Sequence, residues 1–254
     1  MSHFYDRTTG ELIDGNLRDA RKVNALPSPT TVLGILGSPG LKWYFRRQIW
    51  EATCTTPRPP GMADEDYWEL CQKWADEHAK NARESGGDFH SLVQKFHERC
   101  MKGDGDDFAA EMLSSIKEHS HDNILPQFQA YTIWYFANVR RSLMAEQAVI
   151  GQGYAGRVDH VAEMMDGRIA CLDCKTQDIT KKKKFTYYSN FAIQLAAYAG
   201  AIQPMPNCLI SVMVSSNLPA VVESKTWERP VDYYLKIFMG LLSYWSFDND
   251  YHPA

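Results

Sequence analysis

Apolar and polar positions follow one pattern up to about Met144 and another pattern after it. In the first part, apolar residues recur at helical spacing, which predicts a mainly helical portion over residues 1–144. Ser28 is a good helix cap and Pro29 suits a first helical turn. The predicted helices are one opening near Ser28–Thr31, one carrying Trp43 and Trp50 after a break at 37–40, and others over 64–83, after Gly86–Gly87, and over 107–119 and 124–144.

After Met144 the apolar residues come in short runs rich in β-branched side chains, which is typical of strands. These runs predict strands over 145–164, 167–177 and 207–216, a short edge strand within 220–228, and helices over 187–202 and 229–247. The order is helices first and then β-β-β-α-β-α, which predicts an α/β fold with an N-terminal helical portion. We expect one domain over 1–254, with its chemistry in residues 145–254.

Charge and composition limit the classes of function. The net charge is −4, so any binding of nucleic acid must be local. The longest apolar runs are shorter than the roughly 18 residues that a membrane span needs, and the first residues do not resemble a signal peptide. We therefore expect a cytoplasmic protein. Cys171 and Cys174 form a CxxC within a predicted strand, where this spacing places them on opposite faces, so we expect reduced, packed thiols.

The predicted hairpin over 156–177 carries two acids and a lysine among apolar residues. Residues two apart in a strand face the same side, so Asp173 and Lys175 project together. A two-residue turn would pair Asp159 with Cys174 and direct it to the other face. A three-residue loop at 165–167, with Gly167 in the left-handed conformation, pairs Asp159 with Asp173 instead. We predict this second register.

In that register the two carboxylates stand about 5 Å apart and repel each other. A hard divalent cation such as Mg²⁺ or Mn²⁺ would resolve the conflict, because both prefer carboxylate oxygens. Lys175 could then orient water or stabilise charge on a phosphate. A surface salt bridge between Asp173 and Lys175 is the alternative, and spacing alone does not decide between the two interpretations.

Four motifs in order resemble the PD-(D/E)XK nuclease superfamily, in its RecB-like branch. The segment "GRVD…DCK" resembles the hairpin signature, with Asp159 as the first acid and Asp173-x-Lys175 as the second half. "QLAAY" matches a Q-x-x-x-Y helix motif, and "GGDFH" resembles the entry to a helix that carries a histidine ligand. "LPSPTTVLGIL" followed by "GLKWY" looks like the N-terminal segment of phage-type and mitochondrial-genome-maintenance-type exonucleases.

The resemblance implies a mixed central sheet flanked by helices, with a restriction-endonuclease-like α-β-β-β-α-β core. It implies that Asp159 and Asp173 bind one or two Mg²⁺ or Mn²⁺ ions, together with the backbone carbonyl of Cys174. His90 would complete the metal shell, and Lys175 would act on the attacking water. Some relatives hold an iron–sulfur cluster through cysteines near the C-terminus, but this chain has none after Cys208, so we expect no cluster.

Other residues are assigned to the substrate or its support. Gln194 and Tyr198 would brace the lysine or touch the substrate backbone. In the run at 181–184, Lys182 and Lys183 could hold DNA phosphates, although such runs are often only solvated. Glu146 could be a supporting acid.

The resulting prediction is a metal-dependent deoxyribonuclease, an exonuclease acting on single-stranded DNA or DNA ends in a bacterial or phage-infected cell. A recombination or repair protein is the partner expected besides DNA. The alternatives are a structure-selective or restriction-type endonuclease and a non-catalytic DNA-binding or assembly subunit.

Overall fold

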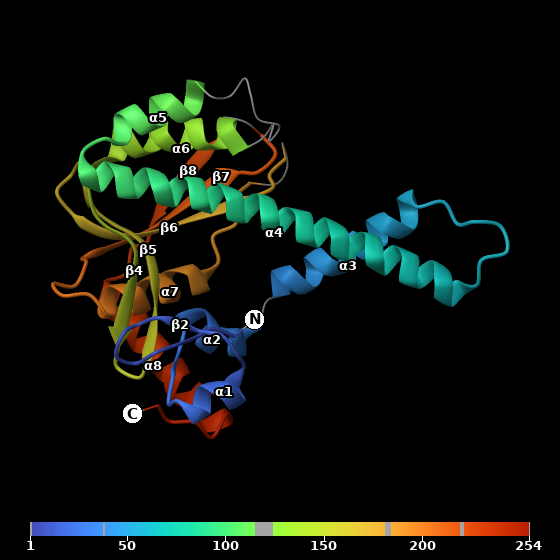
Figure 1. Cartoon of the computed structure of the whole chain (residues 1–254), viewed down its shortest axis with the longest axis horizontal. Coiled ribbons are helices and arrows are strands. Elements are labelled where there is room, and N and C mark those ends of the chain that lie inside the picture. The colour runs from blue at the N-terminus through green and yellow to red at the C-terminus, as the bar shows by residue number, and fades with distance from the viewer. Residues whose placement is uncertain (1, 38, 115–123, 181–183, 219–220, 254) are drawn as a thin grey trace. The chain divides into compact units, whose positions relative to one another are not determined.

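A computed structural model describes residues 2–37, 39–114, 124–180, 184–218 and 221–253 (Figure 1). The chain divides into two compact units, one formed by residues 1–35 and 89–254 and the other by residues 36–88. Within the parts of the chain that are described, no helix is long and apolar enough to cross a membrane.

The larger unit contains two sheets. A small antiparallel sheet near the N-terminus has the order β2-β1-β3, and the main sheet has the order β4-β5-β6-β7-β8. Only β6 and β7 pair in parallel in the main sheet; its other neighbours are antiparallel. The strands are β1 (Phe4–Tyr5), β2 (Leu12–Ile13), β3 (Leu26–Pro27), β4 (Val139–Gly151), β5 (Tyr154–Met164), β6 (Ile169–Gln177), β7 (Cys208–Ser215) and β8 (Val222–Thr226).

Helices cover both faces of the main sheet (Figure 1). On one face lie α5, α6 and the later part of α4, and on the other lie α7 and α8. Helix α7 is the crossover that the parallel pair β6–β7 requires. The helices are α1 (Leu17–Lys22), α2 (Pro29–Leu33), α3 (Pro39–Thr55), α4 (Asp64–Lys102), α5 (Gly105–Ser114), α6 (Ile124–Asn138), α7 (Ser189–Gly200) and α8 (Val231–Asp248).

Alternation along β6 links each side chain to one of these helical layers. Leu172 and Cys174 pack with phenylalanines of α4 and α6, whereas Cys171 packs with Leu195 of α7. Because neighbouring residues of a strand point to opposite faces, Asp173 points to the same side as Cys171, toward the α7 layer. The opposite-face prediction for the two cysteines is confirmed, and both are buried free thiols.

The smaller unit, residues 36–88, is a helical hairpin formed by α3 and the first part of α4. The Tyr67 hydroxyl donates to the carbonyl oxygens of Thr53 and Thr56, each at 2.9 Å, and so ties α4 to the end of α3. Small side chains, among them Ala52 and Ala75, are buried within the hairpin. Trp43 and Trp50 are exposed, so these two aromatic side chains of α3 do not pack in the core.

The α/β fold with a mixed central sheet is confirmed. The predicted β-β-β-α-β-α order is found with the predicted short edge strand, β8, added before the last helix. Two local predictions differ from the structure, and one small sheet has no counterpart among the predictions. Helix α4 continues through Gly86–Gly87, because each glycine costs only about 1 kcal/mol in a long helix. Residues 139–144 begin β4 rather than ending a helix, since pairing with β5 overrides local propensity. The small sheet at the N-terminus was not predicted, because its strands have only two residues each.

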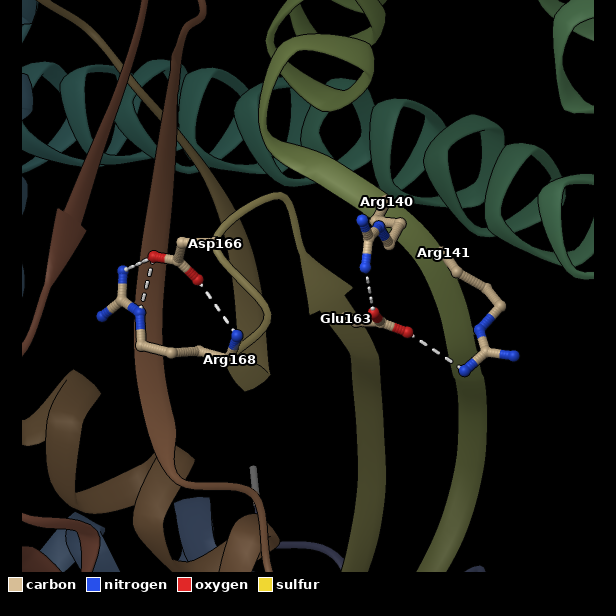
Figure 2. Close-up of polar contacts among 5 residues, drawn as sticks. All are labelled: Arg140, Arg141, Glu163, Asp166 and Arg168. Carbon is tan, nitrogen blue, oxygen red and sulfur yellow. Dashed lines mark hydrogen bonds and ion pairs between the residues drawn. The ribbon is translucent and has the colours of Figure 1, made fainter.

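The turn between β5 and β6 has the three-residue loop that the sequence predicts. The Met164 amide donates to the Arg168 carbonyl (2.8 Å), the Gly167 amide donates to the Met164 carbonyl (2.9 Å), and Gly167 has a left-handed φ of 85°. Figure 2 shows Asp166 in the loop paired with Arg168 at 2.6 Å. It also shows Glu163 of β5 held at 3.0 Å by both Arg140 and Arg141 of β4.

Exposed ion pairs of this kind contribute up to about 1 kcal/mol each, so the bulged loop and the burial of alternate residues fix the register. The ladder runs from Glu163 opposite Ile169 to His160 opposite Leu172. Continued by one residue, it sets Asp159 opposite Asp173. The predicted three-residue register is confirmed.

Substitution of Gly167 by alanine should lower the free energy of unfolding by about 1–2 kcal/mol, because an L residue strains at positive φ. Among the residues that the structure describes, none has an atom within 4 Å of a Cβ built here, so the strain is conformational. Urea unfolding measures the change. Gly167→Asn serves as the matched control and should cost less, because asparagine tolerates the left-handed region. Equal costs for the two variants would contradict the assigned cause.

Candidate active site

The ladder between β5 and β6 ends where the two acids stand. Beyond His160 and Leu172, β5 continues to pair with β4, and β6 continues to pair with β7. The two central strands therefore separate at Asp159 and Asp173, and we call this point of separation the fork. A fork of this kind leaves backbone and side-chain groups of both strands free to meet a ligand, because they are not used in the ladder.

Lys175 is bound to Asp173 on the same face of β6. Its Nζ lies 3.0 Å from Oδ1 and 2.8 Å from Oδ2 of Asp173. It also lies 5.1 Å from the ring centroid of Phe191 in α7. Asp173 is only 3% exposed, so this is a buried carboxylate with one cationic partner. Burial alone would lower the pKa of Lys175, but the charges of Asp173 and Asp159 outweigh it and raise that pKa. The lysine is therefore a cation.

In the described part of the chain, no cation is within ion-pair distance of Asp159, whose carboxyl instead lies at hydrogen-bond distance from Asp173. Burial, and next the charge of Asp173, raise the pKa of the Asp159 carboxyl well above its ordinary value, while Lys175 opposes this rise. One lysine thus faces two acids, and the second acid keeps its proton more strongly than an exposed aspartate. Two buried carboxylates with one cation are short of positive charge.

His90, from α4, reaches the site from the other layer. It lines a small cavity of about 10 Å³ with Asp159, Glu146 and Cys174, which is space for about one water molecule. Burial lowers the pKa of His90, and Lys175 also lowers it, while Asp173 raises it. His90 is therefore neutral near pH 7 and has a ring nitrogen available as an acceptor or ligand.

Glu146 is brought to the same cavity by an irregular stretch of β4. Ala145 pairs with His160 and Gln147 pairs with Val158, so Glu146 lies opposite Asp159. Its backbone has a left-handed φ of 48°, a conformation that is uncommon and strained for residues other than glycine. Glu146 therefore adds a third acid to the row that crosses β4, β5 and β6.

Gln194 and Tyr198 lie on the α7 side of the fork. The Gln194 amide donates to the Tyr198 hydroxyl at 3.3 Å. Burial raises the pKa of Tyr198, and the charges of Asp159 and Asp173 contribute in the same direction. Tyr198 can approach the fork because Gly156 has no side chain. A Cβ at Gly156 would lie 2.8 Å from Cε1 of Tyr198 and 3.1 Å from Pro29.

The remaining predicted residues are only partly placed. The Cys174 thiol is buried in the α4 layer, and burial raises its pKa well above the ordinary value, so its side chain is not a thiolate ligand. Lys182 and Lys183 lie outside the described residues.

A buried pair of histidines below the site was missed in the sequence. His97 and His160 stack with ring centroids 3.8 Å apart. Each has one polar partner, the Tyr131 hydroxyl for His97 and the Ser142 hydroxyl for His160, both at 2.7 Å. His160 pairs with Leu172 and faces the α4 layer, away from the acids. Pairing of His97 with His160 could not be foreseen, because it depends on how α4 crosses β5.

Comparison with known proteins identifies the family. Residues 66–209, more than half of the chain, match the PD-(D/E)XK nuclease superfamily. The chain belongs to this superfamily. The matched range includes Asp159, Asp173 and Lys175 at the fork. Membership implies a nuclease.

A solved structure described as "Crystal structure of SSO0001" is similar over 80% of this chain and 85% of that chain, with 10% identity and a TM-score of 0.28. This likeness is too weak to carry an argument. No curated protein matches the chain.

PD-(D/E)XK nucleases generally use divalent metal ions, and the donor set here fits such an ion. Within the described residues, no three His, Cys, Asp or Glu side chains already form a metal-ligand group. Both oxygens of Asp173 instead face Lys175. The fit rests on the chemistry of the fork, where two carboxylates oppose each other. The raised pKa of Asp159 shows that this carboxyl lacks enough positive charge nearby. A hard cation would supply that charge. His90 and Glu146 are further donors beside Asp159.

Asp159→Asn should raise the melting temperature of the metal-free protein, by more at pH 8 than at pH 5. The folded state holds the Asp159 proton to a higher pH than the unfolded chain, so stability falls as pH rises through the folded pKa. Asparagine does not titrate, so the Asp159→Asn variant does not lose this stability as the pH rises. Differential scanning fluorimetry in EDTA measures it, and Asp166→Asn, an exposed acid of the same hairpin, is the control. A lower melting temperature for Asp159→Asn at pH 8 would contradict the account.

Gly156→Ala should destabilise the protein by about 1–3 kcal/mol, the usual cost of overpacking. The cause is the contact with Tyr198, so the same substitution should cost less in a Tyr198→Leu background. Urea unfolding of the two single variants and the double variant gives the coupling energy. Additive effects would show that the Tyr198 ring is not what excludes the side chain.

Proposed function

We propose that the chain is a Mg²⁺- or Mn²⁺-dependent deoxyribonuclease that degrades single-stranded DNA or DNA ends as an exonuclease. The observation that supports hydrolysis is the Asp173–Lys175 ion pair facing Asp159 at the point where β5 and β6 separate. A protein that kept the fold only to bind DNA would have no need of a buried carboxylate row. The exonuclease assignment is supported by the four ordered sequence motifs and by their likeness to phage-type exonucleases.

In the proposed site, Asp159 and Asp173 would hold the cation, with the Cys174 carbonyl, His90 and Glu146 as further donors. When bound, a divalent cation lowers the pKa of water and polarises the phosphodiester. Lys175 is held as a cation between Asp173 and Phe191, so it donates a hydrogen bond to a non-bridging phosphate oxygen and stabilises charge that develops there. Tyr198, supported by Gln194, offers a hydroxyl toward the sugar–phosphate backbone.

The other proposed properties rest on the sequence motifs alone. Lys182 and Lys183 would hold phosphates beyond the end of β6, and the residues 1–254 would act as one nuclease in the cytoplasm of a bacterial or phage-infected cell. A structure-selective endonuclease with the same fork is the second candidate, since the three catalytic residues serve either reaction.

Asp173→Ala should abolish metal-dependent degradation of end-labelled linear single-stranded DNA, with activity falling at least about 100-fold. The variant removes a cation ligand and leaves Lys175 without its partner. Asp166→Ala is the matched control, because it removes an exposed acid from the same hairpin, and it should retain activity.

The form of the DNA separates the candidates. An exonuclease should degrade linear strands and leave closed circular single strands intact in Mg²⁺ or Mn²⁺. Cleavage of circles would instead identify an endonuclease. Absence of metal-dependent cleavage in the wild-type protein, with DNA binding retained, would leave the binding-subunit alternative.

A further inference from the structure

Helix α3 carries large aromatic side chains on the side opposite its packed face. Gln48 and Ala52 are buried. Trp43 is 57% exposed and Trp50 is 64% exposed. At roughly 100° per residue, the two tryptophans lie together on the helix and point away from Gln48 and Ala52. They contribute little to the stability of the 36–88 unit, and exposed aromatic residues gathered on one face are typical of an interaction surface.

Two arginines lie between the tryptophans on the same face. Around the helix, Arg46 and Arg47 flank the line through Trp43 and Trp50, each about 50° to one side of it, and both are exposed. The Arg47 guanidinium lies 5.6 Å from the Trp43 ring centroid and binds Glu51 at 2.6 Å. Among the described residues, Arg46 has no carboxylate within ion-pair distance. We call these four residues the tryptophan–arginine face.

Charge within the unit is divided between its two helices. Helix α3 has three basic residues and one acid. The first part of α4, over 64–88, has eight acids and three basic residues. An anionic chain is therefore attracted to α3 and repelled by the neighbouring part of α4. The division also explains how a protein with net charge −4 can bind nucleic acid locally.

We infer that the tryptophan–arginine face binds single-stranded nucleic acid by stacking bases on Trp43 and Trp50 while Arg46 and Arg47 contact phosphates. Every base has a flat π face, so such stacking tolerates any sequence. The two tryptophans are seven residues apart, about 10 Å along the helix, which spans a few nucleotides. Duplex bases hide their faces in the stack, so a single strand is the better partner. This inference rests on the proposed nucleic-acid substrate but not on its cleavage.

The test is binding of a fluorescein-labelled oligothymidylate to the full chain in EDTA, followed by fluorescence anisotropy. Trp43→Ala/Trp50→Ala should weaken binding about ten-fold or more, because loss of one stacked base alone costs on this order. Trp68→Ala is the matched control: Trp68 is 48% exposed but lies on the acidic helix of the same unit, so its loss should leave the affinity unchanged.

A second variant tests the charges without removing an aromatic ring. Arg46→Gln/Arg47→Gln should weaken binding and reduce the dependence of affinity on salt, by about one phosphate contact for each arginine that is lost. Both double variants change exposed side chains, and circular dichroism and melting temperature check that they fold as the wild type does.

Unchanged affinity in the tryptophan variant overturns the inference. The inference is also overturned if the tryptophan variant loses self-association in sedimentation but keeps its DNA binding. That result would mark the face as an interface between copies of the chain. Hydrolysis of bis(p-nitrophenyl) phosphate in Mn²⁺ separates this result from the proposed function. The tryptophan variant should retain that hydrolysis and Asp173→Ala should lose it. Binding through α3 without any hydrolysis would sustain the inference and refute the nuclease.

Discussion

The repulsion between Asp159 and Asp173 is the constraint on which the rest of the site depends. Two carboxylates that face each other across a fork, with one lysine bound to Asp173, leave the site short of positive charge. A protein tolerates such an arrangement only when folding elsewhere supplies enough stability to hold it. The surrounding elements do this, because β5 pairs with β4 and β6 pairs with β7 over most of their lengths, and helices cover both faces.

The fold brings groups to the fork from three directions. Strand β4 provides Glu146, helix α4 provides His90, and helix α7 provides Phe191 and the Tyr198–Gln194 pair. Each comes from a rigid element rather than a loop, which favours a fixed geometry for a cation and its substrate. The buried His97–His160 stack beneath the fork adds to this rigidity, because both rings are hydrogen-bonded to hydroxyls of neighbouring elements.

Much of the fork could be predicted from the sequence because strand periodicity is strict. The spacing of Asp173 and Lys175 fixes their common face, and a glycine able to adopt positive φ at 167 selects the loop that sets Asp159 opposite Asp173. Glu146 and Gly156 were harder to interpret, since their roles depend on a strained backbone and on one ring of a distant helix. The exposure of Trp43 and Trp50 also could not be predicted, because an apolar residue on a helix indicates burial unless the packed face is known.

The central claim is that the fork is a site for a hard divalent cation held by the two aspartates. The most direct measurement is a crystal structure of the protein soaked with Mn²⁺, with diffraction data collected at a wavelength where manganese scatters anomalously. The account predicts an anomalous peak between the carboxylates of Asp159 and Asp173, with Lys175 moved off at least one oxygen of Asp173. A fork without such a peak, while Mn²⁺ binds elsewhere on the same molecule, would contradict it.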